Sequence, residues 1–279
     1  MKDFFIAKKI LPAVYAITGE AVARYLIIGK KRALLFDTGY GFADLKKFVR
    51  TLTDLPLDVV ISHGHVDHAG ANCFFDEKIY MHSADLPVYE HHQSREFRKI
   101  SYGILNQAQK IVFFYRHLIP KNYSEEEYLN APLYKNFVDV KEGYVFDLGG
   151  ISAEVVEIPG HTPGSIGLYC KELRLFLASD GINGGVWLFL PESCNLSEYI
   201  CSLKKAEKLD FDYLLTGHST ELVPKSTLQD YLDVAENLDF ENGKIQKESA
   251  YAPGVEVRAC RSKMNKKNKA RICIRADKL

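Results

Sequence analysis

Four side chains that could bind a metal ion lie within six residues of this sequence, at positions 63–68. An apolar run ends at Ile61 and leads into a loop with three imidazoles and one carboxylate, namely His63, His65, Asp67 and His68. Gly64 and Gly70 permit the tight backbone turns that such a loop needs. Imidazole nitrogens and carboxylate oxygens are ordinary zinc ligands, so the loop predicts a metal site rather than a packing element.

Three single residues elsewhere become candidate metal ligands when they are considered together with this loop. His161, Asp180 and His218 each follow a strand-like apolar run and lie in a turn that contains Gly, Pro or Ser. Each alone would be interpreted as a turn residue, because turns favour such residue types for backbone reasons. Together with the loop at 63–68, they favour one shared metal-binding constellation.

The order of these motifs resembles that of the metallo-β-lactamase superfamily. Its members carry, in succession, an Asp, the motif HxHxDH, a His, an Asp and a His. This chain has Asp37 in Phe36-Asp37-Thr38-Gly39 ahead of the loop and the other three residues after it. The resemblance spans about residues 20–220. It implies a four-layer αββα sandwich of the α/β (α+β) class that binds two divalent metal ions per chain.

The resemblance also implies a role for each motif residue. The ligands of the first ion would be His63, His65 and His161, and those of the second would be Asp67, His68 and His218. Asp180 would bridge both ions. Asp37 would brace the metal loop without binding metal.

The chemistry of the seven side chains agrees with that allocation. Five imidazoles and two carboxylates suit zinc, with iron or manganese as alternatives. Two ions about 3.5–4 Å apart can share a hydroxide, since metal binding lowers the pKa of water to about 7. The expected reaction is therefore hydrolysis by a metal-bridging hydroxide. Asp67 is the candidate catalytic residue, because it could bind the second ion and also orient the hydroxide or carry its proton.

Several branches of the superfamily share this full ligand set. A true β-lactamase is disfavoured, because that branch generally lacks a bridging carboxylate where Asp180 stands. The flavodiiron branch is disfavoured, because it has a glutamate where His65 stands. Glyoxalase II-like thioesterases, acyl-homoserine lactonases, phosphodiesterases and ribonucleases remain. We expect a small ester, thioester or lactone as substrate. A phosphodiesterase or ribonuclease, or a non-catalytic metal-binding sensor, is the alternative.

Residues after Asp180 are candidates for the substrate pocket. Known lactonases carry a tyrosine here, whereas this chain has Asn183, which weakens the case for a lactonase. Trp187 either lines an acyl pocket together with Asn183 or fills the core. The histidines outside the motifs are expected at the surface or in ordinary hydrogen bonds; they are His82, His91, His92 and His117.

Strand and helix patterns organise the chain as one expected domain, residues 1–279. Short strand patterns occur at 21–28, 33–36 and 59–61, with an amphipathic helix pattern at 42–52. A helical insert occupies about 84–140, with helical spacing at 104–119 and a helix start at Ser124, and a closing β-pair lies at about 255–275. The insert would cap the metals, pack on the sandwich or form a homodimer contact. Its apolar residues are Phe97, Tyr102, Ile104, Ile111, Phe113, Phe114 and Tyr115.

Composition excludes several other classes. Basic and acidic residues balance at 36 each, so the chain has no strong net field for nucleic acid, and a nucleic-acid partner is not expected. Nine of the basic residues lie at 258–279, which we interpret as a solvated hairpin rather than an RNA-binding arm. The six cysteines lack CxxC spacing and are expected to be reduced thiols. No apolar stretch has the length of a membrane helix, so we expect a soluble cytoplasmic protein that acts on a small molecule.

Overall fold

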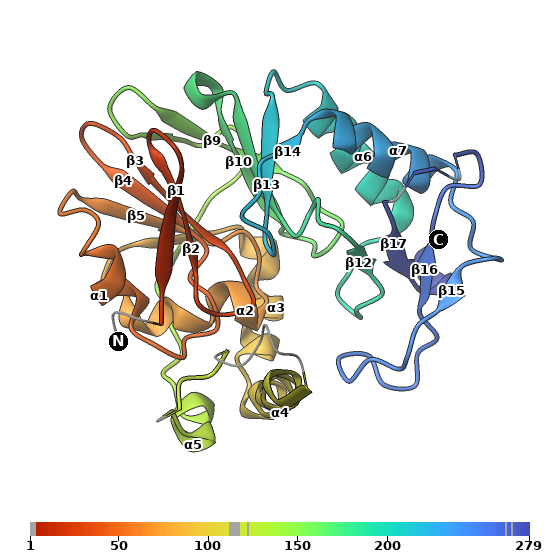
Figure 1. Ribbon diagram of the computed structural model, residues 1–279, viewed down its shortest axis with the longest axis horizontal. Helices are drawn as coiled ribbons and strands as arrows, with labels where there is room; N and C mark the ends of the chain where they lie inside the picture. The colour runs from red at the N-terminus through yellow and green to blue at the C-terminus, as the bar shows by residue number, and fades with distance from the viewer. Residues whose placement is uncertain (1–3, 112–117, 122, 266, 269) are drawn as a thin grey trace.

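The computed structural model describes residues 4–111, 118–121, 123–265, 267–268 and 270–279. Two mixed β-sheets pack face to face, with helices on both outer faces (Figure 1). The first sheet, in spatial order, consists of β1 (Ile6–Leu11), β2 (Val14–Thr18), β3 (Arg24–Ile28), β4 (Ala33–Phe36), β5 (Leu57–Val60), β6 (Ile79–Met81) and β7 (Phe137–Asp139). The second consists of β14 (Val223–Pro224), β13 (Tyr213–Thr216), β11 (Leu175–Ser179), β10 (Ile166–Cys170), β9 (Ser152–Glu157) and β8 (Val145–Asp147).

Successive side chains of the central strands point to opposite faces of the sheet and so belong to different apolar layers. In β3, Tyr25 and Ile27 belong to the apolar layer between the two sheets, whereas Leu26 belongs to the layer on the outer face of the first sheet. That outer layer is completed by Leu45 and Val49 of the short helix α1 (Leu45–Val49). The first sheet is therefore buried on both faces.

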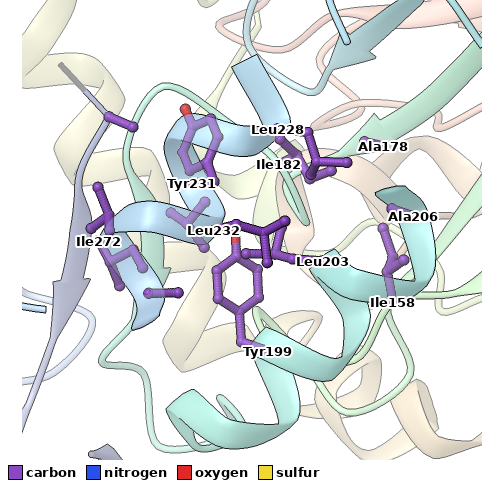
Figure 2. Close-up of a cluster of buried hydrophobic side chains, with 14 of the residues drawn as sticks. Ile158, Ala178, Ile182, Tyr199, Leu203, Ala206, Leu228, Tyr231, Leu232 and Ile272 are labelled. Carbon is purple, nitrogen blue, oxygen red and sulfur yellow. The ribbon is translucent and has the colours of Figure 1, made fainter. Parts of the chain in front are cut away.

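Two longer helices cover the outer face of the second sheet. They are α6 (Leu196–Glu207) and α7 (Ser226–Glu236). Figure 2 shows Tyr199 and Leu203 of α6 gathered with Leu232 of α7 in one apolar cluster. Helix α6 begins in a capping box, in which Asn195 and Glu198 each accept a hydrogen bond from the other's backbone N–H. The four-layer αββα sandwich expected from the resemblance is thus confirmed.

A small third sheet joins the middle of the chain to its C-terminal part. Its order is β12 (Val186–Leu188), β17 (Ile272–Ile274), β16 (Arg258–Cys260) and β15 (Lys244–Ile245). Strands β16 and β17 pair antiparallel, and β17 also pairs parallel with β12, so that Trp187 lies opposite Cys273. The segment that follows Asp180 is therefore held by strands from the end of the chain (Figure 1).

The region between β6 and β8 is mostly helical. It contains α3 (Leu86–His92), α4 (Arg95–Ile111), α5 (Glu125–Leu129) and strand β7. Helix α4 begins at Arg95, well before the helical pattern at 104–119. Hydrophobic periodicity does not detect its first turns, because the side chain that they bury is charged. Arg98 is that side chain, and it donates to the carbonyl of Tyr128 and to Gln93 Oε1. Phe113, Phe114, Tyr115 and His117 lie outside the described residues.

Other local expectations agree more closely with the structure. The strand pattern at 33–36 coincides with β4, and α5 begins where Ser124 caps it in a second capping box with Glu127. The amphipathic pattern at 42–52 is realised only over Leu45–Val49, because Asp44 caps the helix there. Within the described part of the chain, no helix combines the length and apolarity needed to cross a bilayer.

Candidate metal centre

Strand ends of both sheets converge at one edge of the sandwich. Asp37 follows β4, and the loop at 63–68 follows β5, its parallel neighbour. In the second sheet, β9, β11 and β13 run in the same direction and lead to His161, Asp180 and His218. Because strands of one direction end at the same edge of a sheet, residues far apart in the sequence meet there.

Each histidine of the motifs is anchored through one ring nitrogen to an acceptor in the protein. The five contacts are His63 Nδ1 to Ser62 Oγ at 2.9 Å, His65 Nε2 to Glu192 Oε1 at 3.0 Å, His68 Nδ1 to Asp37 Oδ2 at 2.8 Å, His161 Nδ1 to the Trp187 carbonyl at 2.9 Å, and His218 Nδ1 to the Ala21 carbonyl at 2.7 Å. A carbonyl or carboxylate oxygen can only accept, so in four of the rings the anchored nitrogen carries the proton. The Ser62 hydroxyl donates its own proton to Asp37 Oδ2, so it accepts from His63 Nδ1. In a neutral ring the other nitrogen has a free lone pair, which is the form that binds metal.

The closest of these inner nitrogens face each other. His65 Nδ1 lies 3.0 Å from His161 Nε2, although the outer nitrogen of each ring already holds that ring's proton. Two lone pairs at that distance repel unless a cation lies beside both. The pair therefore fits a metal ion, and His63 joins it in a group whose ligand atoms all lie within 4.8 Å of one another.

Two inner nitrogens are buried without a hydrogen-bond partner among the described residues. They are His63 Nε2 and His68 Nε2. An unsatisfied buried polar atom costs roughly 1–3 kcal/mol, which a metal ligand bond would remove. His68 forms a second group of donor atoms with Asp67 and His218.

Asp180 lies between the two groups. Its Oδ2 is 3.1 Å from His218 Nε2 and 3.8 Å from His161 Nε2, so one carboxylate oxygen faces a ring from each group. Asn183 Nδ2 donates to the other oxygen at 3.2 Å. This placement suits a carboxylate that contacts two ions.

Burial and the neighbouring carboxylates shift the pKa values of the histidine rings in opposite directions. Burial lowers the pKa of His63 and His65, and lowers that of His161 to about 4, so these three rings are neutral at neutral pH. Burial opposes charge on His218 as well, but Asp180 and Asp67 outweigh it and raise the pKa of His218 to about 9. Bound metal would replace the proton that these carboxylates attract.

Asp37 holds the loop from behind. Its Oδ1 accepts from the Ser62 backbone N–H at 2.7 Å. Its Oδ2 accepts from the hydroxyls of Ser62 and Ser179 and from His68 Nδ1. Asp37 adopts a φ of 68°, a strained value for a residue with a side chain, and these contacts hold it there. It is occupied by loop contacts, in contrast to Asp67 and Asp180.

Comparison with known proteins accords with this geometry. A sequence profile described as the metallo-beta-lactamase superfamily matches residues 17–218. The chain belongs to the metallo-β-lactamase superfamily. Members of the superfamily use divalent metal ions, typically zinc, and this member is a metal-dependent hydrolase.

Individual relatives are distant. Acyl-coenzyme A thioesterase MBLAC2 of Gallus gallus is 26% identical over 203 residues, which cover 69% of this chain and 69% of that protein. Hydroxyacylglutathione hydrolase GloC of Haemophilus influenzae is 24% identical over 161 residues, which cover 56% of this chain and 65% of that protein. Among solved structures, the metallo-beta-lactamase family protein TTHA1429 from Thermus thermophilus has a TM-score of 0.55 at 19% identity, covering 80% of this chain and 79% of that chain. The similarity to TTHA1429 concerns the fold alone.

Sequence reasoning missed three side chains next to the candidate metal centre. Glu192 and His92 adjoin His65, and Asp85 adjoins the loops that carry His65 and His161. His92 is buried and hydrogen-bonded to Glu192, so of its two expected positions, the surface or an ordinary hydrogen bond, the structure shows the second. His82 is hydrogen-bonded to Glu157, and His91 is exposed.

Asp85 ties two ligand-bearing loops together. Its carboxylate accepts from the backbone N–H groups of Gly64 and Gly164, both at 2.6 Å, and from Thr162 Oγ1 at 2.8 Å. A side chain at Gly64 would place its Cβ 2.5 Å from the Tyr89 backbone nitrogen, so a glycine is required for this approach. A single Asp near a helix start would be interpreted as a cap, and the sequence offers no further signal.

A cavity of about 760 Å³ opens onto the candidate metal centre. One wall comes from the helical region and the other from the segment after Asp180 and the C-terminal sheet. Its apolar lining includes Ile104, Leu105, Ala108, Leu118, Val186, Trp187 and Leu190, and its polar lining includes Asp67, Asn183, Gln246, Tyr251 and Arg271. Both candidate pocket residues, Asn183 and Trp187, therefore face this space.

The Asp85 contacts predict a strong effect on stability. Asp85→Ala leaves two backbone N–H groups and one hydroxyl without their acceptor, so the free energy of unfolding should fall by at least about 2 kcal/mol in urea denaturation. Asp76→Ala is the control, because the Asp76 carboxylate is 97% exposed and its loss should change stability by no more than about 0.5 kcal/mol. Equal stability of the two variants would show that Asp85 does not hold the loops.

Proposed function

We propose that this chain binds two divalent metal ions, with zinc as the first choice, and hydrolyses a small acyl thioester or ester. His63, His65 and His161 would hold one ion, Asp67, His68 and His218 the other, and Asp180 would bridge them. The observation that carries the proposal is the common orientation of the five rings, each anchored outward and each with its free nitrogen directed inward.

The bound ions would lower the pKa of water to about 7 and polarise the acyl carbonyl. The protein's own residues would hold the ions in place and receive the proton of the attacking water. Asp67 lines the cavity, and its Oδ2 lies 3.5 Å from both His68 Nε2 and His218 Nε2. A carboxylate at this position can bind the second ion and hold the proton that the attacking water releases. Asn183 would keep Asp180 in place through its bond to Oδ1.

The cavity supports an acyl substrate. Ile104, Leu105 and Ala108 of α4 line it together with Trp187 and Leu190, so a hydrocarbon chain would be buried beside the metals. The helical region would thus act as a cap over the substrate. The two relatives named above act on an acyl-coenzyme A and on a hydroxyacylglutathione, both of which are thioesters.

Arg271 supports an anionic carrier for that acyl group. Its side chain is exposed and lines the cavity beside Gly185, where any Cβ would lie 2.9 Å from Arg271 Nε. The missing side chain at Gly185 leaves room for the guanidinium along the cavity wall. A guanidinium binds phosphate and carboxylate groups through charge-assisted hydrogen bonds, and thiol carriers such as coenzyme A carry these groups.

Metal content is the first test. Elemental analysis of the purified chain should find close to two transition-metal ions, and Asp180→Ala should lower this content and reduce thioester hydrolysis by orders of magnitude. Asp210→Ala is the control, because Asp210 is paired with exposed Arg174 on the surface. A chain that contains no transition metal and takes up no added zinc would refute the proposal.

The apolar wall predicts a chain-length limit. Ala108→Phe should fill part of the cavity, so kcat/KM for long acyl chains should fall at least tenfold, or about 1.4 kcal/mol, while short chains react as before. Gln107→Phe adds the same bulk to the exposed neighbouring position and should leave the ranking unchanged. An unaltered chain-length profile in Ala108→Phe would place the acyl group elsewhere.

Arg271 predicts a KM effect. Arg271→Ala should raise KM for an acyl-coenzyme A about tenfold with little change in kcat, because the guanidinium would bind substrate and transition state alike. The neutral thioester of a short thiol should show no such change. Arg261→Ala removes the same charge from the same C-terminal region outside the cavity and should match the wild type. A tenfold fall in kcat for Arg271→Ala would instead indicate a role in the chemical step.

A further inference from the structure

Glu192 lies outside the motifs identified in this sequence, yet its carboxylate contacts His65, a candidate metal ligand. It is placed in the turn between β12 and α6, far along the chain from the loop at 63–68 (Figure 1). One oxygen, Oε1, accepts hydrogen bonds from His65 Nε2 at 3.0 Å and from His92 Nε2 at 2.8 Å. The side chain is only 15% exposed, so these bonds are largely shielded from water.

The bond to His65 matters because His65 differs from the other four rings. It turns Nδ1 towards the metal centre, whereas the other four turn Nε2. Its proton must therefore reside on Nε2, and a carboxylate acceptor at that atom fixes this tautomer. Burial disfavours charge on Glu192, but the hydrogen bonds from His65 and His92 outweigh it and hold the pKa of Glu192 well below its ordinary value.

His92 restrains the same ring by packing. Its ring is stacked on His65, with centroids 4.2 Å apart and an interplanar angle of 14°. Phe97 of α4 packs against His92 with centroids 3.8 Å apart, and Phe97 is stacked in turn on Tyr251. Rotation of the His65 ring would break both the stack and the bond to Glu192.

We propose that Glu192 and His92 are positioning residues that hold the His65 ring and its proton so that Nδ1 binds metal. This inference rests on the proposed metal site at His63, His65 and His161. The alternative is a third metal ion among His65, His92 and Glu192, whose donor atoms also lie close together. Convergence of both ring nitrogens on one oxygen at hydrogen-bond distances favours the positioning role, since each ring needs only its ordinary proton.

Glu192→Gln tests the inference through zinc affinity, measured by competition with a chromophoric chelator. The neutral amide accepts more weakly than the carboxylate and can also donate a hydrogen bond to His65 Nε2, which would favour the wrong tautomer. One of the two zinc ions should bind about 10–100-fold more weakly, the range for loss of a partner behind a metal ligand, and the other should bind within about twofold of the wild type. In cobalt-substituted protein, the visible absorption of the weakened site should change.

His92→Phe is a second variant that keeps an aromatic ring between His65 and Phe97 but removes the Nε2 donor. It should weaken the same ion by a smaller factor, and the double variant should fall no further than Glu192→Gln alone, because the two residues act on one ring. If Glu192→Gln does not fold, His92→Phe decides the matter by the same affinity measurement. Glu157→Gln is the matched control, since Glu157 accepts from His82 at 3.2 Å in a pair outside the cavity lining.

Three results would overturn the inference. Wild-type affinity for both ions in Glu192→Gln and His92→Phe would show that neither residue positions His65, and would leave the proposed function intact. A third zinc ion in the wild type, lost in both variants, would show that the cluster is itself a metal site. A wild type that binds no zinc would refute this inference and the proposed function together.

Discussion

The candidate metal centre depends on the outward hydrogen bond that each of five histidines makes. An imidazole has one proton and two nitrogens, so an acceptor behind the ring determines which nitrogen is free to bind metal. Here the acceptors are the carbonyls of Ala21 and Trp187, the carboxylates of Asp37 and Glu192, and the hydroxyl of Ser62. They come from four separate segments of the chain, since Trp187 and Glu192 are neighbours in one of them. The chemistry of the site is therefore a property of the whole fold, and the ligands alone do not define it.

The architecture explains how these acceptors are held. The carbonyl behind His161 belongs to β12, which pairs with β17 near the end of the chain. The acceptor behind His65 follows directly in the turn before α6, and the stack on His92 reaches α4 and Tyr251. The C-terminal sheet and the helical region thus line the cavity and also support the candidate metal ligands. A substitution in the cavity wall of such a fold can therefore also lower metal affinity, because the same segments line the cavity and support the candidate ligands.

The sequence predicted the candidate site where several ligand-type residues lie close together, and it failed where a contact depends on one isolated residue. The loop at 63–68 concentrates four ligand-type side chains, and residues 161, 180 and 218 follow strands, so all seven could be predicted as ligands, and the structure brings their donor atoms together. Asp85, His92 and Glu192 could not, because one carboxylate or imidazole in a helix or turn has an ordinary explanation and its partner lies far away in the sequence. The start of α4 was missed for a related reason, since Arg98 is buried through hydrogen bonds and not through apolarity. The Arg271 side of the cavity depends on the pairing of β12 with β17, which no local pattern encodes.

The most direct test of this account is the coordination of each histidine ring in the zinc-loaded protein, read by ¹⁵N NMR of the imidazole nitrogens. The outward hydrogen bonds predict that His63, His68, His161 and His218 bind through Nε2 and that His65 alone binds through Nδ1, with the proton of each ring on the other nitrogen. Rings whose signals do not respond to zinc, or a His65 that binds through Nε2, would contradict it.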